Sequence, residues 1–390
     1  MLSVEKAYQA MKSLVTQLPV LGGEMVSTYE SLGRVLAQDI HALADHPSFD
    51  QSAMDGFAFQ WQEGKFEFAL IGTIAAGDTP NQWLPQADQC VRIMTGAPVP
   101  QSCDTVVMVE HATVAETIRM PVGTRRGQHI RKRGSNVTCG QTIFAAGTRI
   151  TPAILGALAT QGMTQVHVRQ KLTVQVAATG SEVVALGDPL GPGQIINSNS
   201  PMIAGMLRGL ASVVEGGIVA DTLEGLSAYL SASKASLNVL SGGVSAGDFD
   251  FVPEAARLSG YRQIFHKVAM KPGKPIWLGV HPEGRVLVGL PGNPVSTWVA
   301  TRLFVIPLIE AWTGGAWCDP PWIQLPLLAP LSNRGDRVTF LPAHVSGQGV
   351  NAIHTQGSGD LIAFAQANSL MRLEPASSAD AGTMVSVLWC

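Results

Sequence analysis

The spacing of hydrophobic positions changes several times along the chain, and each spacing predicts a different kind of element. A helix capped by Ser3 is expected near the N-terminus, because apolar residues recur there three and four positions apart, at Val4, Ala7, Met11 and Leu14. A second helix is expected near residues 28–36. Short β-forming runs broken by Gly and Pro predict strands between 68 and 109. Thr151-Pro152 then begins a further helix, which ends at Gly162.

Between residues 172 and 312, apolar runs of strand length alternate with helical patterns. Strands are expected at 172–178, 213–219, 237–240, 276–280 and 286–290, and helices at 201–210, at 223–232 and from Pro294 onward. This alternation is typical of βαβ units, so we expect a mostly parallel sheet covered by helices. After Asp319-Pro320-Pro321 the helical period disappears, and short runs with Gly and Asn turns predict a small β domain.

Composition narrows the class of protein. The 390 residues are 46% hydrophobic and 14% charged, which predicts a soluble protein of two to four domains. A net charge of -3 argues against a nucleic-acid binder, so an anionic ligand would need a local cluster of cations. Neither a membrane span nor a secretory signal is expected. The five cysteines include no C-x-x-C pair, which favours reduced thiols in a cytoplasmic protein.

Three polar loops follow predicted strands, at 179–182, 241–250 and 291–296. Ligands of parallel sheets bind at the carboxyl ends of the strands, so these loops are expected to meet at one binding edge. Gly242 and Gly243 let the backbone approach anionic oxygens. Asp248 and Asp250 suit a hard cation such as Mg²⁺. Local positive charge is supplied by Lys267, Lys271 and Lys274.

Each of these features also has an ordinary structural interpretation. A Gly-Gly turn is often only a tight connection, and Asn293-Pro294 is a common way to begin a helix. Loop lysines are often solvated, and Asp221 is placed where it would cap a helix at 222–230. The occurrence of three such loops at one edge of the same sheet favours a binding site over these readings.

Several longer motifs carry a resemblance to a known family. They are the blocks at 47–58 (PSFDQSAMDGFA), 92–100 (RIMTGAPVP), 193–199 (GQIINSN), 241–250 (SGGVSAGDFD), 270–275 (MKPGKP) and 290–296 (LPGNPVS). In this order and spacing the chain resembles the molybdopterin molybdenumtransferases, a group that includes one domain of the eukaryotic protein gephyrin. The matches run from about residue 5 to residue 360.

The resemblance implies a fold of four parts around a central doubly wound α/β domain. An elongated helical domain would comprise 1–41 and 138–168, and a β-rich lid domain 42–137. The α/β molybdopterin-binding domain would span 169–315, and a C-terminal β-barrel-like domain 316–390. The family forms homodimers, with the active site between the α/β and C-terminal domains of one subunit and the lid of the other. Asp55 is therefore expected to act across the dimer interface.

The activity implied is insertion of molybdenum from molybdate into adenylylated molybdopterin, with Mg²⁺ and with release of AMP. By resemblance, catalysis involves the carboxylates of Asp55, Glu182, Asp221 and Asp250, and the last three would also hold the metal. Contacts with the substrates are implied for Thr95, Gly242, Gly243, Ser245, Lys267, Lys271, Lys274, Ser296, Arg337 and Ser358. Implied partners are a molybdopterin adenylyltransferase and cofactor-accepting proteins. Tungstate would fit the same site as molybdate.

Departures from the family pattern leave room for other activities. The chain has Ser181 in place of an Asp, Ser135 and Asn136 in place of Glu and Asp, and no histidine after Ser358. A binding protein without turnover is one alternative, although four retained carboxylates beside a lysine cluster argue against it. An adenylyltransferase acting one step earlier is a second alternative, and a nucleotide-modifying hydrolase is a third.

Overall fold

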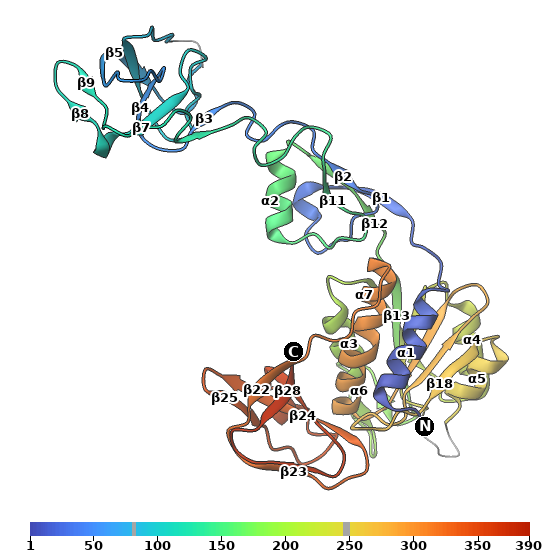
Figure 1. Cartoon of the computed structure of the whole chain (residues 1–390). Helices are drawn as coiled ribbons and strands as arrows, with labels where there is room; N and C mark the ends of the chain where they lie inside the picture. The colour runs from blue at the N-terminus through green and yellow to red at the C-terminus, as the bar shows by residue number, and fades with distance from the viewer. Residues whose placement is uncertain (80–82, 245–249) are drawn as a thin grey trace.

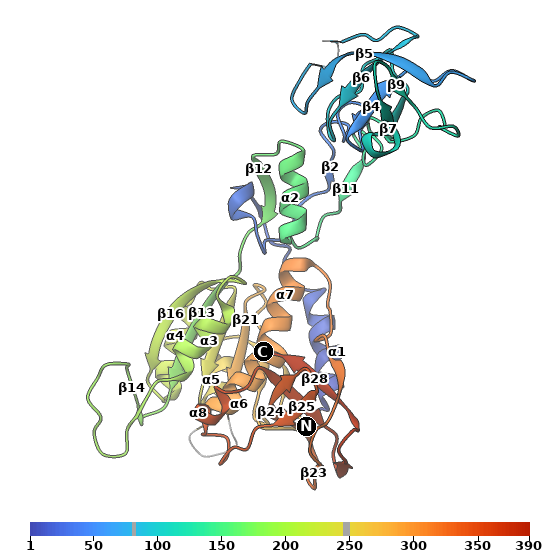
Figure 2. The same cartoon turned by 90° about the vertical axis from the view of Figure 1, so that its left-hand side faces the viewer.

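The computed structural model describes residues 1–79, 83–244 and 250–390 and shows an elongated molecule (Figures 1 and 2). A β-rich lid forms one end, a small middle segment follows, and the α/β domain with the C-terminal sheet forms the other end. The chain begins beside the α/β domain, runs out to the lid and returns. Segments distant in sequence therefore build the middle of the molecule together.

Six strands form the central sheet, in the order β16, β13, β17, β21, β20 and β18. Their bounds are Ser212–Val219 (β16), Thr173–Thr179 (β13), Leu237–Ser241 (β17), Val286–Leu290 (β21), Trp277–Val280 (β20) and Arg262–His266 (β18). The first four strands are parallel, as expected, whereas β20 is antiparallel to both of its neighbours. The sequence pattern missed β18, which begins with two exposed polar residues.

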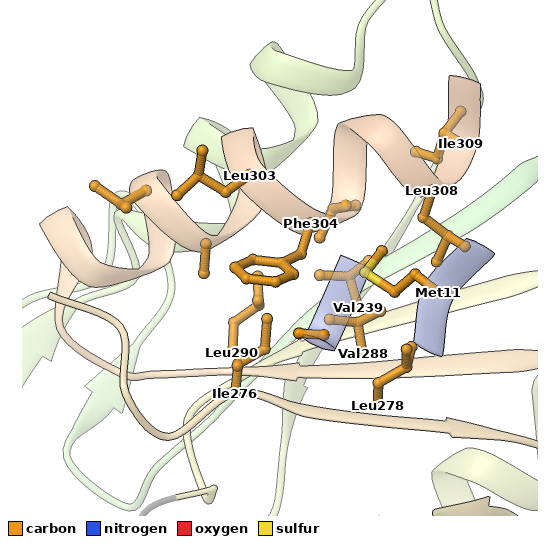
Figure 3. Close-up of a cluster of buried hydrophobic side chains, with 14 of the residues drawn as sticks. Met11, Val239, Ile276, Leu278, Val288, Leu290, Leu303, Phe304, Leu308 and Ile309 are labelled. Carbon is orange, nitrogen blue, oxygen red and sulfur yellow. The ribbon is translucent and has the colours of Figure 1, made fainter. Parts of the chain in front are cut away.

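Helices cover both faces of this sheet, which confirms the doubly wound arrangement. The bounds are Val4–Val15 (α1), Asn199–Leu207 (α3), Pro294–Ala300 (α6), Thr301–Val305 (η3, a π-helical segment) and Ile306–Gly314 (α7) on one face, and Leu223–Ala232 (α4) and Val252–Leu258 (α5) on the other. Neighbouring strand residues point to opposite faces, so Val239 joins the α7 side and Leu240 the α4 side. Figure 3 shows the first of these cores, with Phe304 among the strand side chains.

The N-terminal helix packs against the α/β domain. Residues 1–41 were expected to join 138–168 in a helical domain. In the structure α1 begins after Ser3, which accepts a hydrogen bond from the Lys6 amide at 3.2 Å. Its predicted apolar face is buried in the core of the α/β domain, against α7 and β18. The pattern predicted the helix and its buried face, but not the partner that covers it.

The middle segment is less helical than expected. It holds the helix α2 (Pro152–Thr160), capped by Thr151 as predicted, and two small sheets. These sheets pair β1 (Gly23–Ser27) with β12 (Gln165–Arg169), and β2 (Ile40–His41) with β11 (Thr142–Phe144). The helix expected near 28–36 is only the 3-10 turn η1 (Thr28–Glu30).

The lid is built on a six-stranded sheet, in the order β7, β4, β6, β5, β9 and β8. The strands span Thr105–Met108 (β7), Gly56–Phe59 (β4), Gln89–Ile93 (β6), Glu67–Ile74 (β5), Ile118–Arg119 (β9) and Thr113–Val114 (β8), and the 3-10 turn η2 (Val109–His111) lies between β7 and β8. A short pair, β3 (Gln51–Ser52) and β10 (Ile130–Arg131), lies beside it. The β-type runs between 68 and 109 predicted β5, β6 and β7, whereas the other strands of the lid lie outside the predicted range.

The C-terminal sheet is joined to the α/β domain by a strand that the α/β domain contributes. Its order is β19, β24, β26, β28 and β22, with β25 paired to β24. The bounds are Met270–Lys271 (β19), Val338–Ser346 (β24), Ser369–Leu373 (β26), Met384–Trp389 (β28), Ile323–Pro326 (β22) and Gly349–Ala352 (β25). A separate strand pair joins β23 (Leu331–Asn333) to β27 (Ser377–Ala379). The short helix α8 spans Leu361–Phe364. Because β19 runs parallel to β24, it fixes one wall of the α/β domain against the C-terminal sheet.

One helix in the described part of the chain is long and apolar enough to span a membrane by length and composition alone. It is the continuous stretch Pro294–Gly314, made of α6, η3 and α7. Its most apolar window is 78% buried inside the protein, in the core of Figure 3. It is therefore a core helix of the α/β domain.

Candidate functional site

A pocket of about 390 Å³ lies where the carboxyl ends of the parallel strands meet. It is lined by the loop after β13, by the start of α3, by the loop after β17 and by the turn before α6. Three carboxylates predicted from the sequence line it, Glu182, Asp221 and Asp250, and so do Gly242 and Gly243. We call it the carboxylate pocket. The three loops therefore meet at one edge of the sheet, as their positions predicted.

Gly242 and Gly243 pass so close to the end of β13 that a side chain would be crowded at either position. Gly242 has φ 104°, and a Cβ there would lie 2.2 Å from the carbonyl oxygen of Thr179. Gly243 has φ 65°, and its Cβ would lie 3.1 Å from the Thr179 methyl group. Only glycine fits both constraints at low energetic cost. The loop can therefore pass directly beneath the pocket.

Asp221 lies at the centre of the acidic side of the pocket. Its Oδ1 accepts a hydrogen bond from the Thr179 hydroxyl at 3.0 Å. Partial burial, together with the charges of Glu182 and Asp250, raises the pKa of Asp221, and the Thr179 bond opposes this rise. The ordinary interpretation of Asp221 as a helix cap is wrong, because Thr222 caps α4 by accepting from the Gly225 amide.

Asn199 holds the floor of the carboxylate pocket together, and the sequence reasoning gave it no role. Its side-chain nitrogen donates to the Ser241 hydroxyl at 2.6 Å and to the Gly292 carbonyl at 2.8 Å. These bonds join the start of α3 to the loops that follow β17 and β21. Asn199 is the last residue of the motif at 193–199, and its buried side-chain amide is the feature of that motif that indicates a role.

The carboxylates do not by themselves form a complete metal site. Within the residues that the structure describes, no three His, Cys, Asp or Glu side chains are grouped closely enough to hold an ion. Glu182, Asp221 and Asp250 nevertheless line the same pocket. A cation bound here would therefore need oxygen ligands from water or from a substrate as well.

A second pocket, of about 620 Å³, lies between the α/β domain and the C-terminal sheet. It is lined by five of the residues for which the resemblance implies substrate contacts, namely Lys271, Lys274, Ser296, Arg337 and Ser358. Arg334 also lines it, and no Asp or Glu is among its described lining residues. We call it the cation pocket. It is a concentrated positive site in a chain of net charge -3.

Backbone contacts between the two domains position the walls of the cation pocket. Arg337 donates from Nη1 to the Met270 carbonyl at 3.2 Å, next to the β19–β24 pair. The Val295 amide donates to the Ser358 carbonyl at 3.1 Å. Trp298 in α6 also packs against Phe364 in α8, with ring centroids 4.7 Å apart and ring planes tilted by 60°, which supports this second contact.

The two pockets adjoin at the start of α6. Asn293 and Pro294 line the carboxylate pocket, whereas Val295 and Ser296 line the cation pocket. Pro294 begins the helix as predicted, but the Asn293 side chain makes no capping hydrogen bond. One ligand lying across this turn would therefore meet acidic groups on one side and basic groups on the other.

Asp55 and Thr95 lie in the lid, at the far end of the molecule from both pockets (Figure 1). The Thr95 amide and hydroxyl donate to Asp55 Oδ1 at 2.6 and 2.8 Å. These bonds lower the pKa of the Asp55 carboxyl. The two predicted residues are thus a preorganised pair, but a single chain does not bring them to the other site residues.

One further predicted residue, Lys267, falls outside the two pockets. Its backbone adopts a left-handed conformation with φ 70°. Its carbonyl accepts from the Leu2 amide at 3.1 Å, which fixes the chain ahead of β19. Ser245 and Asp248 lie outside the described residues.

Comparisons with known proteins match the chain almost throughout. Sequence models of the MoeA N-terminal region (domain I and II), the probable molybdopterin binding domain and the MoeA C-terminal region (domain IV) match residues 2–162, 176–311 and 324–389. A molybdopterin molybdenumtransferase of Staphylococcus epidermidis is 32% identical over 410 residues, covering 99% of this chain and 97% of that protein. This chain belongs to the molybdopterin molybdenumtransferase family. A relative with the same name from Staphylococcus aureus is 32% identical and covers 94% of this chain and 90% of its own length.

Solved structures agree with this family assignment. A molybdopterin biosynthesis moeA protein from Pyrococcus horikoshii superposes with a TM-score of 0.77 at 26% identity, covering 100% of this chain and 99% of its own. A second structure from the same organism gives 0.84 at 22% identity and 100% coverage of both chains, which supports the fold alone. As a member of the molybdopterin molybdenumtransferase family, the chain is an enzyme of molybdenum cofactor biosynthesis.

Two departures from the family pattern lie in an exposed turn between the lid and the middle segment. The Ser135 amide donates to the Lys132 carbonyl, and the Asn136 amide donates to the His46 carbonyl, both at 3.0 Å. Both side chains are exposed and line neither pocket. In this chain they are turn residues remote from the two pockets.

Proposed function

We propose that the chain transfers molybdenum from molybdate to the dithiolene of adenylylated molybdopterin and releases AMP. Two Mo–S bonds form as the two thiols lose their protons, and one oxo group of molybdate leaves with those protons as water. One water molecule cleaves the phosphoanhydride, giving AMP and the molybdopterin phosphate. The oxidation state of molybdenum is unchanged, so no external reductant takes part.

The observation that carries this proposal is the pair of oppositely charged pockets on either side of the turn before α6. Molybdate is a dianion, and the cation pocket offers it Lys271, Lys274 and the Ser296 hydroxyl on one side. The carboxylate pocket suits a phosphoanhydride only with a cation, because its lining includes Asp221 and Asp250. Because the two pockets adjoin, molybdate in one pocket would lie next to the adenylylated molybdopterin whose phosphoanhydride occupies the other.

Mg²⁺ fits the carboxylate pocket in a specific way. Mg²⁺ is usually held by one or two carboxylates, with waters and substrate phosphates completing its octahedral shell. Asp221, Asp250 and Glu182 would supply the carboxylates, and their mutual repulsion favours a cation between them. Mg²⁺ would neutralise the phosphoanhydride and polarise it for attack by water.

A homodimer would complete the site. Asp55 is exposed and held by Thr95 in the lid, far from both pockets of its own chain (Figure 1). A second copy arranged about a two-fold axis would bring its lid over these pockets, and each subunit would then complete the other. The proposed setting is the cytoplasm, where the free thiols of all five cysteines stay reduced. An adenylyltransferase would supply the substrate, and cofactor-accepting proteins would take the product.

The test follows both products at once. The purified chain is incubated without oxygen with adenylylated molybdopterin, Mg²⁺ and molybdate, and AMP and pterin-bound molybdenum are measured. Molybdate-dependent AMP release is expected, and Asp250→Ala should reduce it on the order of a hundredfold or more, since a metal ligand contributes several kcal/mol. Asp188→Ala removes an exposed carboxylate of the same domain and should behave as wild type. Pterin binding without AMP release would instead indicate a binding protein.

A further inference from the structure

The cation pocket contains an arginine that neither the sequence motifs nor the proposed reaction uses. Arg334 lines the pocket beside Lys271, Lys274 and Arg337. Its guanidinium makes no hydrogen bond or ion pair with the described residues, whereas Arg337 already bonds the Met270 carbonyl and lies 3.6 Å from Asp336. An arginine left unpaired at the wall of a positive pocket is available to an anion.

The turn that carries Arg334 is fixed from beneath. Asn333, which is 7% exposed, donates from its side chain to the carbonyls of Arg337 and Glu374, both at 2.9 Å. Its side-chain oxygen accepts from the Gly335 amide at 3.1 Å. The Ala376 amide then donates to the Gly335 carbonyl at 2.9 Å. Both the nitrogen and the oxygen of the buried Asn333 side chain are thus hydrogen-bonded, and these bonds fix the short turn from β23 to β24.

We propose that Arg334 is a further substrate-binding residue, which binds the tetrahedral dianion and sets the affinity for molybdate from the C-terminal domain. Arginine presents a planar fork of N–H donors that matches two oxygens of an oxyanion. Lys271 and Lys274 contact the same anion from the α/β domain, so the dianion lies between cations of both domains. This inference rests on the proposed assignment of molybdate to the cation pocket.

The placement also gives Arg334 a role in capture from solution. Its side chain is exposed, whereas Ser296 deeper in the pocket is 5% exposed. A charge at the mouth attracts a dianion over about a Debye length, roughly 8 Å at physiological ionic strength. Its effect on binding should therefore weaken as salt is added. A purely structural role for Arg334 would not have this salt dependence.

The experiment measures molybdate binding to the full-length protein by equilibrium dialysis, at low and at physiological ionic strength. Arg334→Gln is expected to raise the Kd for molybdate about tenfold at low salt, as for loss of a charge-assisted hydrogen bond, and less at high salt. Arg334→Lys should recover part of the affinity. The control is Arg208→Gln, which removes the exposed arginine directly after α3, outside both pockets, and should leave the Kd unchanged.

The outcomes separate this inference from the proposed reaction. A Kd for Arg334→Gln within twofold of the wild-type value, with the same salt dependence, overturns the assignment of Arg334. Equal losses in Arg334→Gln and Arg208→Gln overturn it too, because only net charge would then matter. A wild-type protein that binds molybdate but releases no AMP refutes the reaction and leaves the role of Arg334 to be decided by its Kd. Absence of molybdate binding in the wild type overturns both.

Discussion

The two pockets are built by different means, although they share the turn before α6. The carboxylate pocket comes from one domain, and its loops follow consecutive strands of one sheet. The cation pocket is assembled from two domains that meet through the pairing of β19 with β24. The shape of the carboxylate pocket therefore depends on local turns, whereas the shape of the cation pocket depends on the contact between two domains. Changes to loops should affect the first pocket, and changes to domain contacts the second.

The largest expected effect concerns a third region, the lid, which a single chain leaves far from both pockets. Asp55→Ala and Asp250→Ala are each expected to be nearly inactive as pure proteins. Mixed and refolded or co-expressed in equal amounts, they should form heterodimers with one intact site, which predicts about a quarter of wild-type activity by random pairing. AMP release from the mixture measures this recovery.

The control for this experiment is a mixture in which both variants lie in the same part of the site. Asp221→Ala mixed with Asp250→Ala should recover nothing, because both residues line the carboxylate pocket of one chain. Recovery in neither mixture would mean that the lid does not act on the partner subunit. Equal recovery in both mixtures would mean that subunit exchange is not the cause.

Much of the carboxylate pocket was predictable because its information is local. A strand followed by Gly242-Gly243, and a helix begun by Pro294, can be read from short segments. In the cation pocket, the sequence pattern alone indicated Lys271 and Lys274 as local positive charge. Ser296, Arg337 and Ser358 were assigned only through family resemblance, and Arg334 was missed. Its turn becomes part of the site only through long-range contacts. Asn333 bonds the Glu374 carbonyl 41 positions away, and the β19–β24 pair joins residues more than 60 positions apart. The placement of α1 was missed for the same reason, since its partners are distant in sequence.

The next largest expected effect tests whether the two pockets bind different substrates. Lys274→Gln removes a cation of the cation pocket and should raise the KM for molybdate by about ten- to a hundredfold, the range expected for hydrogen bonds to charged groups. Affinity for adenylylated molybdopterin should change much less. Initial rates of AMP release at varied concentrations of each substrate measure both constants. Lys171→Gln is the matched control, because Lys171 is exposed and lines neither pocket. An equal loss for both substrates would argue against separate roles for the pockets.

A smaller effect tests the backbone geometry of the carboxylate pocket. Gly242→Ala would place a methyl group 2.2 Å from the Thr179 carbonyl at φ 104°, so the end of β17 must shift. The free energy of unfolding should fall by about 1–3 kcal/mol, as for other strained backbone positions. Gly292→Ala is the matched control, because its nearest neighbour would lie 3.9 Å away. Urea denaturation of both variants measures the difference, and equal stability would show that the close approach is not constraining.

The smallest expected effect is a pH dependence of stability that comes from the carboxylate pocket alone. Burial and the neighbouring carboxylates raise the folded-state pKa of Asp221 above its unfolded value. The folded state then binds the proton more tightly, so this group's contribution is fully present below the unfolded pKa and is lost as pH rises through the folded pKa. Without Mg²⁺, Asp221→Asn should therefore melt slightly above wild type near pH 7, and this difference in melting temperature should close as pH falls below about 3.9. Melting curves across this pH range measure the difference in melting temperature, with Asp188→Asn as the control for net charge.

Addition of Mg²⁺ provides a second measurement on the same two proteins. Mg²⁺ should stabilise only the wild type, so near pH 7 the wild type should then melt above Asp221→Asn. A wild-type melting temperature that Mg²⁺ does not change would count against a metal at Asp221.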